Sequence, residues 1–532
     1  MAEVEDQATR EEDQEGTGKV PRRNGGFEAI FNPPEDQDEV FFDDEQLREE
    51  AVPNLGEHVE LTWRGVIAHL GPAFLISVGY LDPGNWATDI EGGSRFGYEL
   101  LWVLIMSNLM AILLQTLATR LGVVTRSHLA EVCKEEYTGM PSYALWILAE
   151  LAIIATDLTE VLGTAIGLNL VFNIPLVLGV ILTALDTFLL LAVQRHGMRR
   201  LEQLMFGFLA IISACFIAEL FFAKPDILEV VKGTFIPRLN LESLYVACGI
   251  VGATVMPHNF YLHSAIVGDR MTSRSKEAIR AECKYNLIDS AVALNAAVFI
   301  NCAILIISAA NFWAKDIEVA TLQDAYRLLE NTGFTIGKVE VAQLLFGIAL
   351  IASGQSSTLC GTLAGQYVME GFLEIRAPPV IRRLVTRMLA VVPSVIVILA
   401  TGDSGTYQLL ILSQVVLSLQ LPFAVIPLIR FTSSKVRMGE FQNHWAISAL
   451  SWICAVIVIF LNLLLVLSFL KDGFTSEKLV LKILTGVLAT PLFVVVMLFL
   501  LYITFKKERS EDSLYVVDDL SSEDNSMDNF AS

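Results

Sequence analysis

Residues 78–89 read VGYLDPGNWATD and residues 251–263 read VGATVMPHNFYLH, and each stretch interrupts a long apolar segment with a proline. A proline removes one backbone hydrogen bond from a helix and crowds the carbonyl four residues back, and an adjacent glycine weakens the helix further. Irregular backbone at membrane depth is tolerated only around a buried or water-lined site. The two stretches therefore predict two broken helices around a central site.

The rest of the chain has the composition of a membrane protein. Its 532 residues are 54% apolar, with a mean hydropathy of +0.55, which is more apolar surface than one soluble globule could hide. We expect an all-α polytopic membrane protein with about 12 transmembrane helices, because roughly 20 residues cross the hydrocarbon core. The segments lie near residues 66–96, 99–122, 142–172, 175–194, 201–223, 242–267, 285–313, 341–373, 382–401, 406–429, 444–470 and 479–505.

The two interrupted segments are the first and the sixth in this series. They occupy corresponding positions if segments 1 to 5 and 6 to 10 form two repeats of opposite topology. Paired broken helices at such positions are the sequence indication of a central binding site in secondary transporters. The pattern therefore favours an inverted 5+5 repeat with helices 1 and 6 broken.

The net charge of −21 lies almost entirely at the two ends of the chain. Residues 1–60 hold 19 acidic and 5 basic side chains, a net −14, and residues 506–532 hold 8 and 3, a net −5. The acidity therefore indicates neither nucleic acid nor an acidic substrate as partner. We expect a disordered acidic N-tail over 1–58, a transmembrane domain over 60–505 and a short acidic C-tail over 506–532.

Lysine and arginine are divided unequally between the expected loops. Loops after even-numbered segments, with the start of the C-tail, carry 20 of these residues, and loops after odd-numbered segments carry 9. Cytoplasmic loops are the ones enriched in Lys and Arg. Both termini are therefore expected in the cytoplasm. The sequence does not distinguish a plasma membrane from an endomembrane.

The interrupted stretches also carry residues suited to bind a metal ion. Asp82 is a carboxylate near membrane depth, which is costly and hence a functional candidate, and Asn85 follows one turn later. The breaks should free backbone carbonyls, most simply those of Gly79 and Ala253. Met256 adds a thioether, which hard cations such as Ca²⁺ and Mg²⁺ use poorly and softer ions use better. The set favours Mn²⁺, Fe²⁺ or Cd²⁺ over the alternative that Asp82 caps a helix and Met256 fills a gap.

Four stretches, DPGNWATDIEGG, GATVMPHNFYLHS, ASGQSSTLCGTLAGQYVMEGF and SLQLPFAVIPL, resemble the signatures of the Nramp family of proton-coupled divalent metal ion transporters. The resemblance extends over roughly residues 60–505. It implies an inverted repeat of the leucine-transporter type and a metal ion bound by Asp82, Asn85, Met256 and the Ala253 carbonyl. It also implies the Gly79 carbonyl in some states, at a position where many relatives have alanine, and an amide ligand from Gln414.

A proton route needs titratable groups of its own, because a metal ion displaces a proton from its ligands. Candidates are Glu150, Asp157 and Glu160 on segment 3, His258 and His263 on segment 6, and Arg382 and Arg383 at the start of segment 9. The acids are spaced by 7 and 3 residues, which places them on one helical face, and the resemblance assigns proton roles to Asp157 and Glu160. A static ion-pair network, with the two arginines as interface anchors, is the alternative.

Other functions fit the sequence less well. A signalling protein with this fold would need a long C-terminal output region, and a Mg²⁺ or Al³⁺ transporter of the family would lack Met256. An amino-acid symporter would meet repulsion between Asp82 and the substrate carboxylate. We expect no enzyme activity, no cofactor and no metal cluster from the seven scattered cysteines. The expected partners are divalent metal ions, protons and the lipid bilayer, and the oligomeric state stays open.

Overall fold

The first and sixth apolar segments are broken where the sequence predicts it. In the computed structural model, residues 80–82 separate α4 (Pro72–Gly79) from α5 (Pro83–Phe96). Residues 255–256 separate α12 (Leu241–Thr254) from α13 (Pro257–Asp269). Asp82 and Met256 are N-caps with extended backbone, because proline disfavours the helical conformation in the preceding residue and suits the first position of a helix.

The structure describes residues 69–184, 198–270, 275–315, 321–328, 335–336, 339–374, 379–476 and 478–508. They belong to one unit of the chain, Glu45–Ser532. The expected N-tail over 1–58, and the expected C-tail beyond residue 508, lie outside the described residues. In the fourth expected segment, residues 176–184 are helical, and residues 185–194 lie outside.

Long helices form the other segments. They are α6 (Leu101–Thr125), α8 (Met140–Phe172), α10 (Met198–Ala223), α14 (Lys276–Asn311), α16 (Val341–Leu373), α17 (Pro379–Thr432), α19 (Trp445–Thr475) and α21 (Thr490–Phe505). The connections hold α7 (Leu129–Glu136), α11 (Ile227–Phe235), η1 (Trp313–Lys315), α15 (Leu322–Leu328), α18 (Lys435–Met438), η3 (Gly439–Phe441), α20 (Leu479–Leu484) and η4 (Thr485–Ala489). Strands β1 (Thr335–Ile336) and β2 (Val339–Glu340) pair antiparallel.

Two helices differ from the expected boundaries. Segments 9 and 10 form the single element α17, which is divided by a kink at Gly402, where φ is 68°. The helix of segment 7 begins at Lys276 rather than near residue 285, because Ser275 caps it by accepting a hydrogen bond from the Ala278 N–H at 3.2 Å. A count of apolar residues misses such polar helix extensions.

Eight helices in the described part of the chain are long and apolar enough to cross a membrane. They coincide with eight of the expected segments. The broken helices and the acidic α8 stand outside this set. The all-helical polytopic fold class is thus confirmed, while the total of about 12 spans stays a prediction.

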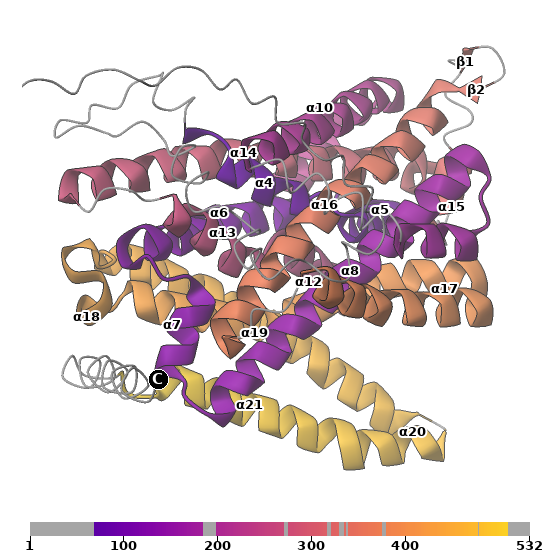
Figure 1. Cartoon of the computed structure of the whole chain (residues 1–532). Helices are drawn as coiled ribbons and strands as arrows, with labels where there is room; N and C mark the ends of the chain where they lie inside the picture. Colours follow the sequence, from indigo (N-terminus) through magenta and orange to yellow (C-terminus); the bar gives the residue numbers. More distant parts are fainter. Residues whose placement is uncertain are drawn as a thin grey trace, which may run out of the picture. The chain divides into compact units, whose positions relative to one another are not determined.

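The helices divide into an inner and an outer group. α8 packs against α16 and α17 (Figure 1), and α5 packs against α14 and α12. In the half of α17 after the kink, 78% of the most apolar stretch is buried, against 11% in the stretch that contains α21. The inner helices therefore surround the two breaks, and most of the apolar surface around α21 is exposed.

Glycines let the broken helices approach their neighbours closely. A Cβ atom built on Gly252 of α12 would lie 2.1 Å from the Gln414 carbonyl oxygen of α17, and one on Gly163 of α8 would lie 2.0 Å from Pro83. Both distances are far below van der Waals contact. The sequence thus sets the spacing of the helices around the breaks with residues that lack a side chain.

We expect Gly252→Ala to destabilise the protein by about 1–3 kcal/mol, because the added methyl group must push α12 away from α17. The measurement is the midpoint of thermal unfolding of the purified protein. Gly207→Ala in α10 is the control, since nothing lies within 4 Å of its added Cβ. Equal midpoints for the two variants would contradict the tight contact between α12 and α17.

Candidate metal site at the two helix breaks

Asp82 lies at the centre of the first break and accepts four hydrogen bonds. Its Oδ1 accepts from the backbone N–H and the Nδ2 of Asn85, both at 2.7 Å. Its Oδ2 accepts from the hydroxyl of Thr159 in α8 at 2.9 Å and from Nε2 of Gln414 in α17 at 3.2 Å. Asp82 is fully buried. The break therefore holds a carboxylate that three separate helices position.

The second break faces the first. A Cβ on Gly79 would lie 3.8 Å from Sδ of Met256 and 3.1 Å from Nδ2 of Asn259. Asn259 Nδ2 donates a hydrogen bond to the Met256 sulfur at 3.6 Å. Met256 and Asn259 are fully buried. The thioether of one break thus lies beside the backbone of the other.

Proline at each break changes the backbone hydrogen bonds. Pro83 and Pro257 have no N–H for the carbonyls of Gly79 and Ala253, which lie four residues earlier. The Gly79 carbonyl instead accepts from the Asp82 N–H in a tighter turn, at 3.2 Å. Ala253 is fully buried. The two carbonyls that the sequence suggests as metal ligands, those of Gly79 and Ala253, are therefore the ones that lack a backbone N–H donor four residues later.

The other carbonyls of the first break are satisfied by side chains. Tyr80 O accepts from Nδ2 of Asn301 in α14 at 3.0 Å. Leu81 O accepts from Nε1 of Trp86 at 3.0 Å and from the hydroxyl of Ser353 in α16. Unsatisfied backbone groups are costly at membrane depth. The irregular backbone is therefore a built feature of the fold.

Two polar residues of this site were missed from the sequence. Thr159 lies between Asp157 and Glu160 on α8, and as a neutral residue it carries a weaker sequence signal than the two acids. Its hydroxyl binds Asp82. Asn259 lies three residues after Met256, the N-cap of α13, and therefore on the same side of the helix one turn later. The signal that could have found Asn259 is its position within the MPHN stretch of the break.

The donor set suits a metal ion of intermediate softness. Among the described residues, no group of three or more His, Cys, Asp or Glu side chains could hold a metal ion. A cation here would meet one carboxylate, neutral amide and carbonyl oxygens and one thioether. Sulfur favours transition metals over Mg²⁺ and Ca²⁺. The geometry thus offers a site with a single formal negative charge.

Two of the three predicted acids on α8 meet an arginine. Nη1 of Arg387 in α17 lies 3.3 Å from Oε2 of Glu160 and 3.9 Å from Oδ1 of Asp157. All three side chains are buried. A Cβ on Gly361 would lie 3.0 Å from Glu160, so a glycine of α16 makes room for the acids. These groups form one buried ionic cluster.

The remaining members of the predicted proton route are placed differently. Glu150 is partly exposed and accepts from Nε1 of Trp146 at 3.2 Å, so it lies apart from the buried cluster. The arginine that lies beside the buried acids is Arg387. The side chains of Arg382 and Arg383 lie outside the described part of the structure, so their expected part in the proton route stays a prediction.

The two histidines of α13 lie in different surroundings. His258 is buried at the second break, and its two ring nitrogens have no hydrogen-bond partner among the described residues. Nδ1 of His263 lies 2.9 Å from Oε1 of Gln115, whose Nε2 donates to the Tyr80 hydroxyl at 2.9 Å. His263 is therefore linked to the first break through Gln115.

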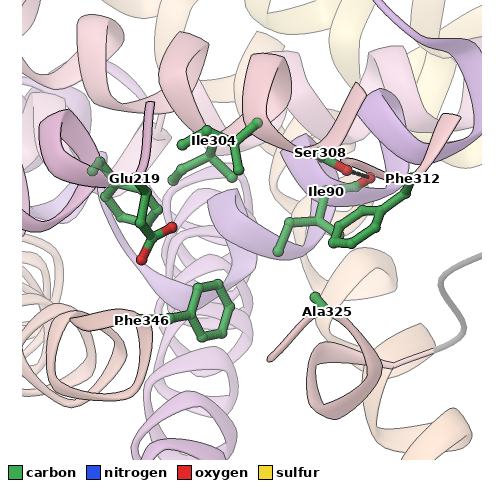
Figure 2. A pocket seen from close by; sticks show the side chains of 9 residues that line it. Ile90, Glu219, Ile304, Ser308, Phe312, Ala325 and Phe346 are labelled. Atoms are coloured by element: carbon green, nitrogen blue, oxygen red, sulfur yellow. Dashed lines mark hydrogen bonds between the residues drawn. The ribbon is translucent and has the colours of Figure 1, made fainter. Parts of the chain in front are cut away.

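A small cavity lies apart from the metal site. It measures about 20 Å³, enough for roughly one water molecule, and Ile90, Phe346 and Glu219 are among its lining residues (Figure 2). Glu219 of α10 is 3% exposed, and its Oε1 has no hydrogen-bond partner among the described residues. The residues of the metal site do not line this cavity.

Comparison with known proteins agrees with this geometry. A family model described as natural resistance-associated macrophage protein-like, Nramp, matches residues 73–468. The chain is 50% identical over 461 residues to the natural resistance-associated macrophage protein 2 homolog of Dictyostelium discoideum, with 86% of this chain and 72% of the relative covered. It is 50% identical over 442 residues to the divalent metal cation transporter MntH of a Nostoc species, with 82% and 97% covered.

The fold is also shared with a solved structure. The crystal structure of the Eremococcus coleocola manganese transporter in complex with an aromatic bis-isothiourea substituted compound superposes with a TM-score of 0.76. The two chains are 33% identical, and the match covers 85% of this chain and 98% of the transporter. The protein is therefore an integral membrane protein and not an enzyme, and the chain belongs to the Nramp family of divalent metal cation transporters.

Proposed function

We propose that this protein carries divalent transition metal ions, Mn²⁺ and Fe²⁺ first, toward the cytosol together with protons. The observation that carries the proposal is that the two breaks face each other: a Cβ on Gly79, three residues before Asp82, would lie 3.8 Å from Met256 Sδ, and Asp82 and Met256 are both fully buried. The relatives named above as divalent metal cation and manganese transporters support the same class of cargo.

The buried ionic cluster supports the proton half of the proposal. On α8, Asp157 lies two residues before Thr159 and Glu160 one residue after it; Thr159 binds Asp82, and Arg387 lies beside both acids. A proton that leaves the metal site has acidic acceptors on the adjacent helix. Ionisable groups inside a membrane bundle commonly form such relays.

The inward direction has an electrostatic basis. A membrane potential that is negative inside contributes about 2.3 kcal/mol per elementary charge at 100 mV. A dication and a proton that move together toward the cytosol both gain from it. The proposed cytoplasmic location of both termini places the C-terminal end of α13 and the start of α14 on the side where the cargo leaves.

Asp82 supplies the single negative charge of the site, so its removal should abolish transport. We expect Asp82→Ala to lose more than about 90% of Mn²⁺ uptake, since a dication is dehydrated here without a counter-charge. The measurement is Mn²⁺ uptake into proteoliposomes at equal protein content. Asp226→Ala, which removes an exposed N-cap from α11, is the control. Half of wild-type uptake in Asp82→Ala would mean that the site lies elsewhere.

Met256 should govern selectivity, because all competing dications share the attraction to Asp82 and only a ligand of different softness separates them. Met256→Ala should lose Cd²⁺ uptake most and Mn²⁺ uptake less, and should gain uptake of Ca²⁺ or Mg²⁺. The expected change in the Cd²⁺ to Ca²⁺ ratio is about 10- to 200-fold, since about 1.4 kcal/mol corresponds to a factor of ten.

The control for this prediction is Met205→Ala, which truncates a fully buried methionine in α10. It should lower all uptake rates by a common factor, if it lowers them at all. The same common factor in Met256→Ala would show that Met256 fills space and does not select the metal.

Proton coupling should depend on the buried cluster more than metal movement does. We expect Asp157→Asn to reduce the acidification of the vesicle lumen that Mn²⁺ evokes more strongly than it reduces Mn²⁺ flux, because the displaced proton loses an acceptor. The quantity to report is the ratio of protons to Mn²⁺ in one preparation, from which losses of folded protein cancel. A wild-type ratio in the variant would favour a static ion-pair network.

A further inference from the structure

Asp89 of α5 is a buried carboxyl group that the proposed function does not use. Its side chain is 0% exposed. Neither of its carboxyl oxygens has a hydrogen-bond partner among the described residues. A polar group in this situation is costly, and an ionised one far more so. Asp89 therefore requires a cation or a proton of its own.

Its position links it to the metal site. Asp82, Asn85 and Asp89 are spaced by three and four residues, which places them along one face of α5. Seven residues of helix correspond to a rise of about 10.5 Å. Charges interact over such a distance where the effective dielectric constant is low, as it is inside a helix bundle. A cation bound at Asp82 would therefore favour the ionised form of Asp89.

The surroundings of Asp89 contain few other ionisable groups. The thiol of Cys302 in α14 is close enough to Asp89 for the two groups to interact electrostatically. Elsewhere on α5, Glu91 and Arg95 pair with each other at 2.9 Å. Other titratable groups on the elements that pack against α5 include Tyr245 and Cys248 of α12, Tyr407 of α17, Asp157 and Glu160 of α8, Cys360 of α16 and Lys315 of η1. The Tyr407 hydroxyl donates a hydrogen bond to the Ala87 carbonyl at 3.1 Å, and the two acids of α8 lie beside Arg387.

The two carboxyl groups of α5 differ in what surrounds them. Asp82 accepts four hydrogen bonds, and bonds of this kind stabilise an ionised carboxylate. Asp89 accepts none from the described residues, so it is better suited to hold a proton while the metal site is empty. A dication at Asp82 adds two positive charges nearby and favours the ionised form of Asp89.

We propose that Asp89 is a second proton-binding site, which releases its proton when a divalent cation binds at Asp82. In this step the O–H bond of the Asp89 carboxyl group breaks, the proton passes to water, and the carboxylate stays behind. The charges of Asp82 and Asp89 then balance those of the dication. The inference rests on the metal site of the proposed function and adds a proton donor to it.

The test is the number of protons released when Mn²⁺ binds to the purified full chain. Calorimetric titrations in two buffers of different ionisation enthalpy, at several pH values, give that number together with the affinity. We expect Asp89→Asn to bind Mn²⁺ but to release about one proton fewer per ion, so that the slope of log Kd against pH falls by about one.

Glu219→Gln is the matched control, because it removes another buried acid from a neighbouring helix. Glu219 acts electrostatically on Cys215 of its own helix, so proton release should equal that of the wild type. Equal release in Asp89→Asn and wild type would overturn the inference and leave the metal site intact. Absence of Mn²⁺ binding to the wild type would instead overturn the proposed function.

If Asp89→Asn does not fold, Asp89→Glu provides a second test, because it retains a carboxyl group at this position. Infrared difference spectra of wild type and Asp89→Glu, with and without Mn²⁺, should each show loss of a protonated carboxyl band, at different frequencies in the two proteins. A band at the same frequency in both, or no such band, would overturn the inference.

Discussion

A proline has no N–H to offer the carbonyl four residues before it, and this deficit at Pro83 and Pro257 shapes the centre of the protein. In water the solvent would compensate, but at membrane depth the protein itself must do so. The Gly79 carbonyl accepts from the Asp82 N–H in a tighter turn, and side chains from α14 and α16, Asn301 and Ser353, bind the next two carbonyls of the first break, those of Tyr80 and Leu81. The broken helix is stable only because distant helices pack around it, so the fold and the site depend on each other.

The hydrogen bonds of Asp82 indicate how binding is coupled to movement. An ionised carboxylate has about four lone-pair sites, and four donors occupy them in this structure. A metal ion at Asp82 must therefore displace at least one donor. The two donors from Asn85 belong to the same helix as Asp82, whereas Thr159 and Gln414 belong to α8 and α17. Loss of Thr159 or Gln414 as a donor would loosen the contact of Asp82 with a neighbouring helix, whereas loss of an Asn85 donor would not.

The sequence predicted the breaks, Asp82 and Met256 because proline and a charge inside an apolar segment are local signals. It did not single out Thr159, Asn259 or Arg387, because these are common polar residues whose roles depend on contacts that only the folded chain shows. Arg387 shows the limit clearly. The adjacent Arg382 and Arg383 form a stronger pattern in the sequence. The register of α17 against α8 nevertheless brings Arg387 to Glu160. That register is determined by packing between the two helices.

Gln414 connects both breaks to the same point of α17. Its side chain binds Asp82, a Cβ on Gly84 would overlap its amide, and a Cβ on Gly252 would overlap its carbonyl oxygen. The first broken helix therefore touches the side chain of Gln414, and the second touches its backbone. A change of rotamer at Gln414 would free α5 without releasing α12, whereas a shift of α17 would move both contacts together. Because closely packed helices have few intermediate arrangements, a shift of α17 at Gln414 would move both broken helices in one event.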